Sequence, residues 1–122
     1  MIKPTNTEEN MVVFAKTHDL ILWLLPKVER FPRAHRFTLT DRLMNAALEV
    51  LDTLTDARYR TGRAKSERLA KADVALARVR SHLFLAHRMS WLSDGAYEHV
   101  SRQVVEVGRL LGGWQRALQK RS

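Results

Sequence analysis

The basic side chains are the residues of this sequence most able to do chemistry, because together they can neutralise phosphate groups. The 122-residue chain has 21 Lys and Arg against 13 Asp and Glu, a formal net charge of +8. Such a charge favours a polyanionic partner, nucleic acid before an acidic membrane, over a role in solubility alone. Arginine outnumbers lysine, and its planar guanidinium group binds phosphate through paired hydrogen bonds.

Ten basic residues are the candidates for contact with nucleic acid. They surround the first expected loop, gather where the second and third helices join, and continue along the third helix: Arg33, Arg36, Arg42, Arg63, Lys65, Arg68, Lys71, Arg78, Arg80 and Arg88. Any one of them could instead be solvated, or paired with an acid such as Asp56, Glu67 or Asp73. Few aromatic residues interrupt the series, so we expect electrostatic binding with weak sequence readout.

Catalytic and metal-binding patterns are absent from the sequence. There is no cysteine, and no histidine has a glutamate three residues before it, the spacing that binds metals inside helical bundles. The five histidines are His18, His35, His82, His87 and His99. A phosphate-binding glycine loop and a nucleophile elbow are also missing. We therefore expect no enzymatic activity, no metal site and no cofactor.

Four segments with apolar periodicity must position these side chains. The 3.6-residue period predicts helices over about residues 8–30, 39–61, 64–91 and 94–119. No segment shows the alternation that is typical of a strand. Four helices with short connections favour an all-α, antiparallel up-down four-helix bundle, and the chain length fits a single domain over residues 1–122.

One side of each helix is expected to enter the core. In the first three helices these sides comprise Met11, Phe14, His18, Ile21, Leu25 and Val28; Leu43, Ala47, Val50, Leu54 and Ala57; and Leu69, Ala72, Leu76, Val79, Leu83 and Ala86. Thr38 or Thr40 is the expected N-cap of the second helix and Ser93 or Asp94 that of the fourth. Gly62 is expected to cap the C-terminus of the second helix.

The last expected helix has two distinct apolar sides. One is a seam that repeats every seven residues: Tyr97, Val100, Val104, Val107, Leu111, Trp114 and Leu118. The other side consists mostly of small residues, as does a second side of the third helix. The residues expected to face another copy of the chain are Ala70, Val74, Ala77, Phe84, Ser101, Val105, Gly108 and Gly112. A glycine inside a helix costs about 1 kcal/mol relative to alanine. Because Gly108 and Gly112 are four residues apart on one side of the helix, we expect another backbone to approach closely there. We therefore predict a homo-oligomer.

No segment of the sequence fits a membrane span. The longest wholly apolar run, Ile21–Leu25, is far shorter than the roughly 20 residues that a spanning helix needs. Residues Met1–Asn6 do not have the layout of a signal peptide. We expect a cytoplasmic protein with no membrane partner.

Three stretches of the sequence resemble one protein family. They are Phe31–Arg42, Asp56–Tyr59 and, most specifically, Val107–Trp114, which reads Val-Gly-Arg-Leu-Leu-Gly-Gly-Trp. The family comprises the accessory variability determinant (Avd) proteins, four-helix-bundle accessory proteins of diversity-generating retroelements. Related bundles encoded in intervening sequences of bacterial ribosomal RNA genes share this architecture, and an RNA-binding protein of that branch is an alternative.

The resemblance implies a more definite function than the residue patterns do. Members of the family are non-catalytic, form a pentameric, barrel-like assembly with a basic surface, and associate with the retroelement's reverse transcriptase and its template RNA during mutagenic cDNA synthesis. By this resemblance, Arg78 and Arg80 match basic positions of the third helix, and Arg33, Arg36 and Arg42 match those of the first loop. A purely structural oligomer or protein-interaction module, in which the positive charge is incidental, is the alternative from a different class.

Overall fold

A computed structural model describes the backbone of residues 7–120 and the side chains of residues 11–120. This part of the chain has four α-helices and no strand, which confirms the all-α prediction. The α-helices are α1 (Thr7–Val28), α2 (Asp41–Arg58), α3 (Gly62–Arg88) and α4 (Asp94–Gln119). A short 3-10 helix, η1 (Arg33–His35), and a π-helix, η2 (Arg36–Thr40), connect α1 to α2. Residues 1–6 and 121–122, which the domain and signal-peptide predictions included, lie outside the described residues.

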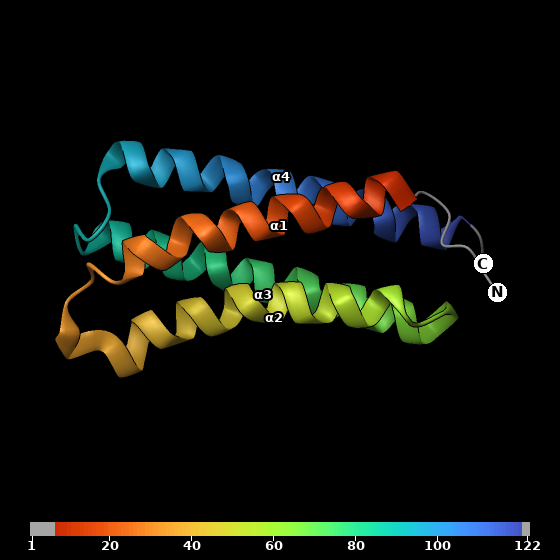
Figure 1. The fold of residues 1–122 in the computed structure, drawn as a ribbon, viewed down its shortest axis with the longest axis horizontal. Helices are drawn as coiled ribbons and strands as arrows, with labels where there is room; N and C mark the ends of the chain where they lie inside the picture. Colours follow the sequence, from red (N-terminus) through yellow and green to blue (C-terminus); the bar gives the residue numbers. More distant parts are fainter. Residues whose placement is uncertain (1–6, 121–122) are drawn as a thin grey trace.

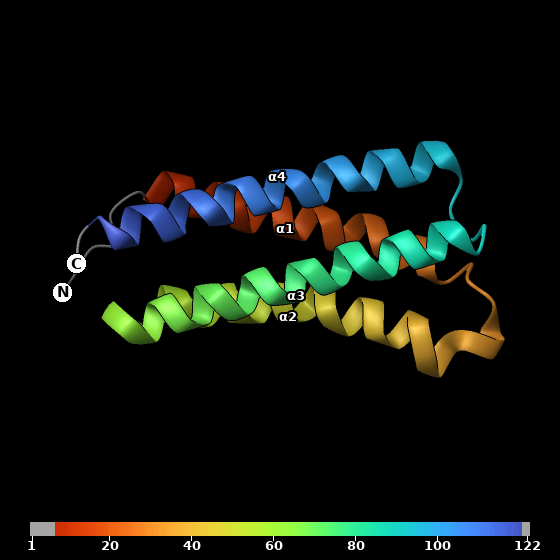
Figure 2. The ribbon, with the colours of Figure 1, turned by 180° about the vertical axis from the view of Figure 1, so that it is seen from behind.

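The four α-helices form a bundle in which each runs antiparallel to the next in the sequence (Figure 1). Helix α1 contacts α2 and α4, and α3 also contacts α2 and α4. The two views of the ribbon show the same square arrangement, in which α1 and α4 form one layer and α2 and α3 the other (Figures 1 and 2). Within residues 7–120, no helix has both the length and the apolar character of a membrane-spanning segment.

The predicted core sides of α2, α3 and α4 are confirmed. All the predicted residues of α2 and α3 are buried, and so are Val100, Val104, Val107, Leu111 and Trp114 of α4. Tyr97 and Leu118, at the ends of the α4 seam, are partly buried against this core. Each seam is buried because it lies on the side of its helix that faces the bundle axis.

The predicted core side of α1 is partly wrong. Ile21 and Val28 are buried, but Met11 (58% exposed), His18 and Leu25 face outward. The core stripe is instead formed by Val13, Thr17, Leu20, Ile21, Leu24 and Val28. Thr17 is tolerated at a fully buried position because its hydroxyl donates a hydrogen bond to the carbonyl oxygen of Val13, at 2.7 Å.

Several helix ends differ from the predictions. The first helix ends at Val28 rather than near residue 30, and the second begins at Asp41 because η2 precedes it. Thr40 occupies the N-cap position with helical backbone angles and makes no capping hydrogen bond, so neither predicted threonine caps α2. Gly62 does not cap α2, since it begins α3 with a φ of 55°, a backbone conformation that glycine adopts readily.

The fourth helix has the predicted N-cap. The Ser93 hydroxyl accepts a hydrogen bond from the backbone N–H of Ala96 at 3.1 Å. Just before it, Trp91 packs against the connection between α1 and α2, with ring centroids 5.4 Å from Phe31 and 5.1 Å from His35. These ring contacts hold the η1–η2 connection against the α3–α4 turn at one end of the bundle.

Candidate nucleic-acid interface

The middle of α3 presents basic residues on both sides of its small-residue stripe. Arg78 lies toward α2, where its Nη1 atom donates a hydrogen bond to Oε2 of Glu49 at 3.5 Å. Arg80 lies toward α4, where its Nη2 atom is 3.9 Å from the position that a Cβ on Gly108 would take. No acidic group in the described part of the chain pairs with Arg80 or with Lys71. Both cations are therefore available to an external anion.

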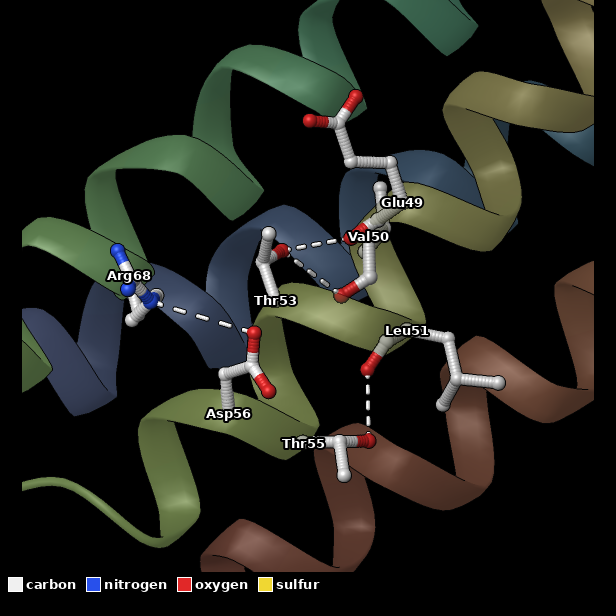
Figure 3. A network of polar contacts seen from close by, with 7 residues as sticks. All are labelled: Glu49, Val50, Leu51, Thr53, Thr55, Asp56 and Arg68. Atoms are coloured by element: carbon white, nitrogen blue, oxygen red, sulfur yellow. Dashed lines mark hydrogen bonds and ion pairs between the residues drawn. The ribbon is translucent and has the colours of Figure 1, made fainter.

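The basic residues at the start of α3 are partly engaged within the protein. Figure 3 shows Arg68 reaching from α3 toward Asp56 of α2, with Nε and Oδ2 4.0 Å apart, and the Arg68 side chain is only 27% exposed. The Lys65 ammonium group lies 5.7 Å from the ring centroid of Trp114. Arg63 pairs with Glu67 at 3.8 Å, but both side chains are largely exposed, so this pair is weak.

The polar side chains beside Asp56 on α2 are satisfied by their own helix. Thr53 donates to the carbonyl oxygens of Glu49 and Val50, at 2.7 and 3.2 Å, and Thr55 donates to that of Leu51 at 2.8 Å (Figure 3). None of these hydroxyls reaches toward Arg68 or another cation. The ion pair with Asp56 is thus the polar link between α2 and the start of α3 in this region.

A third group of basic residues lies at the η1–η2 connection. Arg33 and Arg36 line a hollow of about 370 Å³ that is also lined by apolar side chains. Arg42 is exposed in the first turn of α2. The other residues around the hollow are Val28, Glu29, Phe31, Pro32, Thr40, Asp41 and Met44. Although two of these are acidic, none of the three arginines has an ion-pair partner in residues 11–120.

The structure therefore divides the ten candidate residues into groups rather than bringing them into one patch. Arg88 lies near the η1–η2 end of the bundle, where its guanidinium group is 6.0 Å from the Phe84 ring centroid. Arg68 lies 20 residues earlier on the same helix, roughly 30 Å away at 1.5 Å per residue. A ligand that contacts all the groups must extend along α3.

The residues predicted to face another copy lie on the outer sides of α3 and α4, and two of them, Ala70 and Val74, line a hollow toward α2 together with Glu49 and Arg78. Ala70, Val74, Ala77 and Phe84 are all exposed, as is Val105, whereas Ser101, Gly108 and Gly112 are partly buried. A Cβ on Gly108 would lie 3.4 Å from Cδ2 of Leu76, so Gly108 first accommodates α3 of its own chain. A Cβ on Gly112 would lie 3.2 Å from Nη1 of Arg116, a flexible neighbour on the same helix.

Comparison with known protein families assigns the chain to one of them. A family model described as bAvd-like matches residues 11–118. The chain belongs to the bAvd-like family. This confirms the resemblance to the Avd accessory proteins. No match is found among curated proteins.

The stretch Val107–Trp114 serves the bundle of this bAvd-like protein in three ways. Val107, Leu111 and Trp114 are buried in the core. Gly108 admits the Leu76 side chain. Arg109 donates two hydrogen bonds to the Glu106 carboxylate, from Nε at 3.1 Å and from Nη2 at 2.7 Å. These bonds are the main reason that the pKa of Glu106 lies below its ordinary value, and they raise the pKa of Arg109.

Two surface features of the bAvd-like bundle were missed by the sequence analysis. The outer side of α1 is an exposed stripe of Met11, Ala15, His18, Leu22 and Leu25, spaced at helical intervals. Three of these residues, Met11, His18 and Leu25, were assigned to the core from the sequence, and Ala15 and Leu22 were not singled out. The second feature is Phe37, which is 82% exposed in η2. Its signal was an aromatic residue directly after Arg36 in a segment rich in basic residues.

A metal centre has no candidate in the described part of this bAvd-like chain. No group of three or more His, Asp or Glu side chains there is arranged to hold a metal ion. The close His87–Asp94 contact, 2.7 Å between Nε2 and Oδ1, also includes the stacked Tyr97 ring, with centroids 4.3 Å apart. This contact links the end of α3 to the start of α4.

Proposed function

We propose that this protein is a non-catalytic accessory protein of a diversity-generating retroelement. In this role it is a basic homo-oligomer that binds template RNA or cDNA and the reverse transcriptase, and so supports mutagenic cDNA synthesis. The bAvd-like family match over residues 11–118 carries this proposal. The net charge of +8 adds physical support, since a polyanion is the natural partner of so basic a protein.

The basic residues best suited to bind phosphate are those without an acidic partner. Of the ten candidates, six meet this condition within the described residues: Arg33, Arg36, Arg42, Lys71, Arg80 and Arg88. Arg63 and Arg78 are exposed but each has a glutamate nearby. Neutralising several phosphates releases bound counterions, so affinity depends steeply on salt and weakly on sequence.

Assembly into a ring, with five copies as in the Avd family, requires two unlike faces on each copy, because head-to-tail contacts close a ring. The outer stripe of α1 consists of large apolar residues such as Met11 and Leu22, both more than half exposed. The α3–α4 face, with Ala77 and Gly112 among its residues, is smoother. The proposed contact places the α1 stripe of one copy against the α3–α4 face of the next.

A binding experiment with a salt series tests the proposed function. The protein is titrated into labelled single-stranded and duplex RNA at about 50 to 300 mM salt, and complex formation with the purified reverse transcriptase is measured by size-exclusion chromatography. We expect nucleic-acid affinity to fall by orders of magnitude over this range and the two proteins to elute together. An absence of nucleic-acid binding at every salt concentration would instead favour a protein-interaction module.

A further inference from the structure

The segment formed by η1 and η2 has the features of a site for unpaired nucleotides. Phe37 is the most exposed of the large apolar side chains of residues 11–120, at 82%. It directly follows Arg36, which has no ion-pair partner there. An exposed aromatic ring beside free guanidinium groups is the arrangement on which proteins stack single-stranded bases while binding their phosphates.

A hollow lined by the neighbouring residue Arg36 adds a second observation. It has a volume of about 370 Å³ and is lined by Val28, Phe31 and Met44, with Arg33 and Arg36 among the other lining residues. A base in a duplex is held in its stack, whereas an unpaired base can turn out of its strand and enter a recess of this kind.

Polar residues also line the hollow. Glu29 and Asp41 are among them, and their carboxylates can accept hydrogen bonds from the N–H groups of bases. Thr40 lines the hollow as well, but its Oγ1 atom is buried within the protein and is not open to a ligand there.

We infer that the η1–η2 segment binds an unpaired stretch of nucleic acid, with one base stacked on Phe37, a neighbouring base in the hollow, and the phosphates on Arg33 and Arg36. The inference rests on the proposed nucleic-acid binding and specifies its form. It predicts a preference for single strands over duplexes, which charge alone does not supply because a duplex has the denser phosphate charge.

Substitution of Phe37 tests the stacking contact. Affinity for a fluorescent oligouridylate, for its oligothymidylate counterpart and for an RNA duplex of equal length is measured by fluorescence anisotropy. We expect Phe37→Leu to lose about 5- to 100-fold in affinity for the two single strands and to bind the duplex as the unchanged protein does. Phe37→Trp, which keeps a flat aromatic face, should retain single-strand affinity. Because Phe37 is exposed, circular dichroism should be the same for all three proteins.

Substitution of Met44 tests the hollow. Met44→Ala removes an apolar side chain that lines it, so we expect single-strand affinity to fall about 3- to 10-fold and duplex affinity to stay as in the unchanged protein. Circular dichroism checks that the helix content is retained. An unchanged single-strand affinity for Met44→Ala would overturn the placement of a base in the hollow.

The outcomes separate this inference from the proposed function. If the protein binds RNA but Phe37→Leu leaves single-strand affinity unchanged, or reduces duplex affinity equally, the single-strand site is refuted and nucleic-acid binding stands. If the unchanged protein binds neither form at any salt concentration, both proposals fail. A larger effect on the oligouridylate than on the oligothymidylate identifies RNA as the preferred strand, and the reverse identifies cDNA.

Discussion

The outer sides of α1 and α3 differ in both size and charge of their residues. The outer stripe of α1 includes Met11, Leu22 and Leu25 and contains no arginine or lysine. The outer stripe of α3 consists mainly of alanine, valine and serine, and arginines border it on both sides, with Arg78 toward α2 and Arg80 toward α4. Covering a large apolar surface with another protein lowers the free energy, because the surface is removed from water. In the proposed function the α3 side serves two partners: its small residues admit a neighbouring chain, and Arg80, which has no acidic partner in the described residues, binds phosphate.

Trp114 of α4 contacts residues of both α1 and α3. We therefore expect its removal to have the largest effect on stability. It is buried, with its ring centroid 6.4 Å from that of Phe14 on α1, and Lys65 of α3 lies over the same ring. We expect Trp114→Ala to lower the free energy of unfolding by about 3–5 kcal/mol, as measured by urea denaturation. Arg102→Ala on the exposed side of α4 is the control, with a change under about 0.5 kcal/mol. A midpoint that does not move for Trp114→Ala would contradict its role in the core.

Charge substitutions on the two sides test whether they meet in the assembly. Leu22→Glu with Leu25→Glu alters only the α1 side, and Ala77→Glu with Val105→Glu alters only the α3–α4 side. Either pair should convert the proposed oligomer to a monomer with unchanged helix content, because burying unpaired carboxylates in an apolar contact is unfavourable. Light scattering coupled to size-exclusion chromatography measures the mass.

A mixture of the two variants decides how the sides pair. Each variant retains one intact side, so a head-to-tail contact predicts a heterodimer with one copy of each. If each side instead pairs with its own kind, each variant alone should form a homodimer. Leu48→Glu on the exposed surface of α2 is the control and should leave the oligomer intact. These substitutions are preferable to Gly108→Leu, because Gly108 also faces Leu76 of its own chain.

The same comparison shows what the sequence could and could not predict. On α3 the choice of core side was clear, because one stripe has large residues such as Leu69 and Leu76 and the other has small ones. On α1 both stripes are apolar, and the true core stripe contains Thr17, whose polarity argued against it. Periodicity reports that a side is apolar, but not which neighbour covers it. It therefore could not separate a core side from a side available to another copy.

The candidate site was less predictable than the fold. Sequence position placed the ten basic residues in a series, but it did not reveal that Arg68 is only 27% exposed and lies 4.0 Å from Asp56, while Arg80 has no acidic partner in the described residues. The hollow beside Arg33 and Arg36 is formed in part by residues of the π-helix η2, and the residue pattern does not distinguish a π-helix from an α-helix. Phe37 could be found in the sequence, but its exposure could not.

The two arginines that border the α3 stripe should contribute unequally to nucleic-acid binding. Arg78 is hydrogen-bonded to Glu49, whereas Arg80 has no acidic partner in the described residues. We expect Arg80→Gln to reduce the slope of log affinity against log salt by about 1, and Arg78→Gln to reduce it by less. Arg102→Gln is the matched control, because Arg102 is paired with Glu98 at 2.8 Å on α4. Equal slopes for the Arg80 and Arg78 variants would show that the Glu49 contact does not matter.

We expect the smallest effect on stability from Glu106, which lies between α1 and α4. Its carboxylate accepts hydrogen bonds from Arg109 and interacts electrostatically with Lys16. Hydrogen bonds from Arg109, aided by the charges of Arg109 and Lys16, hold the pKa of Glu106 below its ordinary value, although desolvation acts in the opposite direction. A carboxyl group whose pKa is lowered in the folded state stabilises the protein above its unfolded-state pKa, and this stabilisation is lost as the pH falls through the folded-state pKa.

Glu106→Gln should therefore be slightly less stable than the unchanged protein at about pH 7, and the difference should shrink below about pH 4.3, where the unfolded chain begins to bind the proton. Thermal unfolding at several pH values measures this difference. Glu67→Gln, which removes the partner of Arg63 in a highly exposed pair, is the control and should have no measurable effect at any pH. A deficit for Glu106→Gln that persists unchanged at about pH 3 would mean that the Glu106 side chain stabilises the α1–α4 side by packing rather than by its charge.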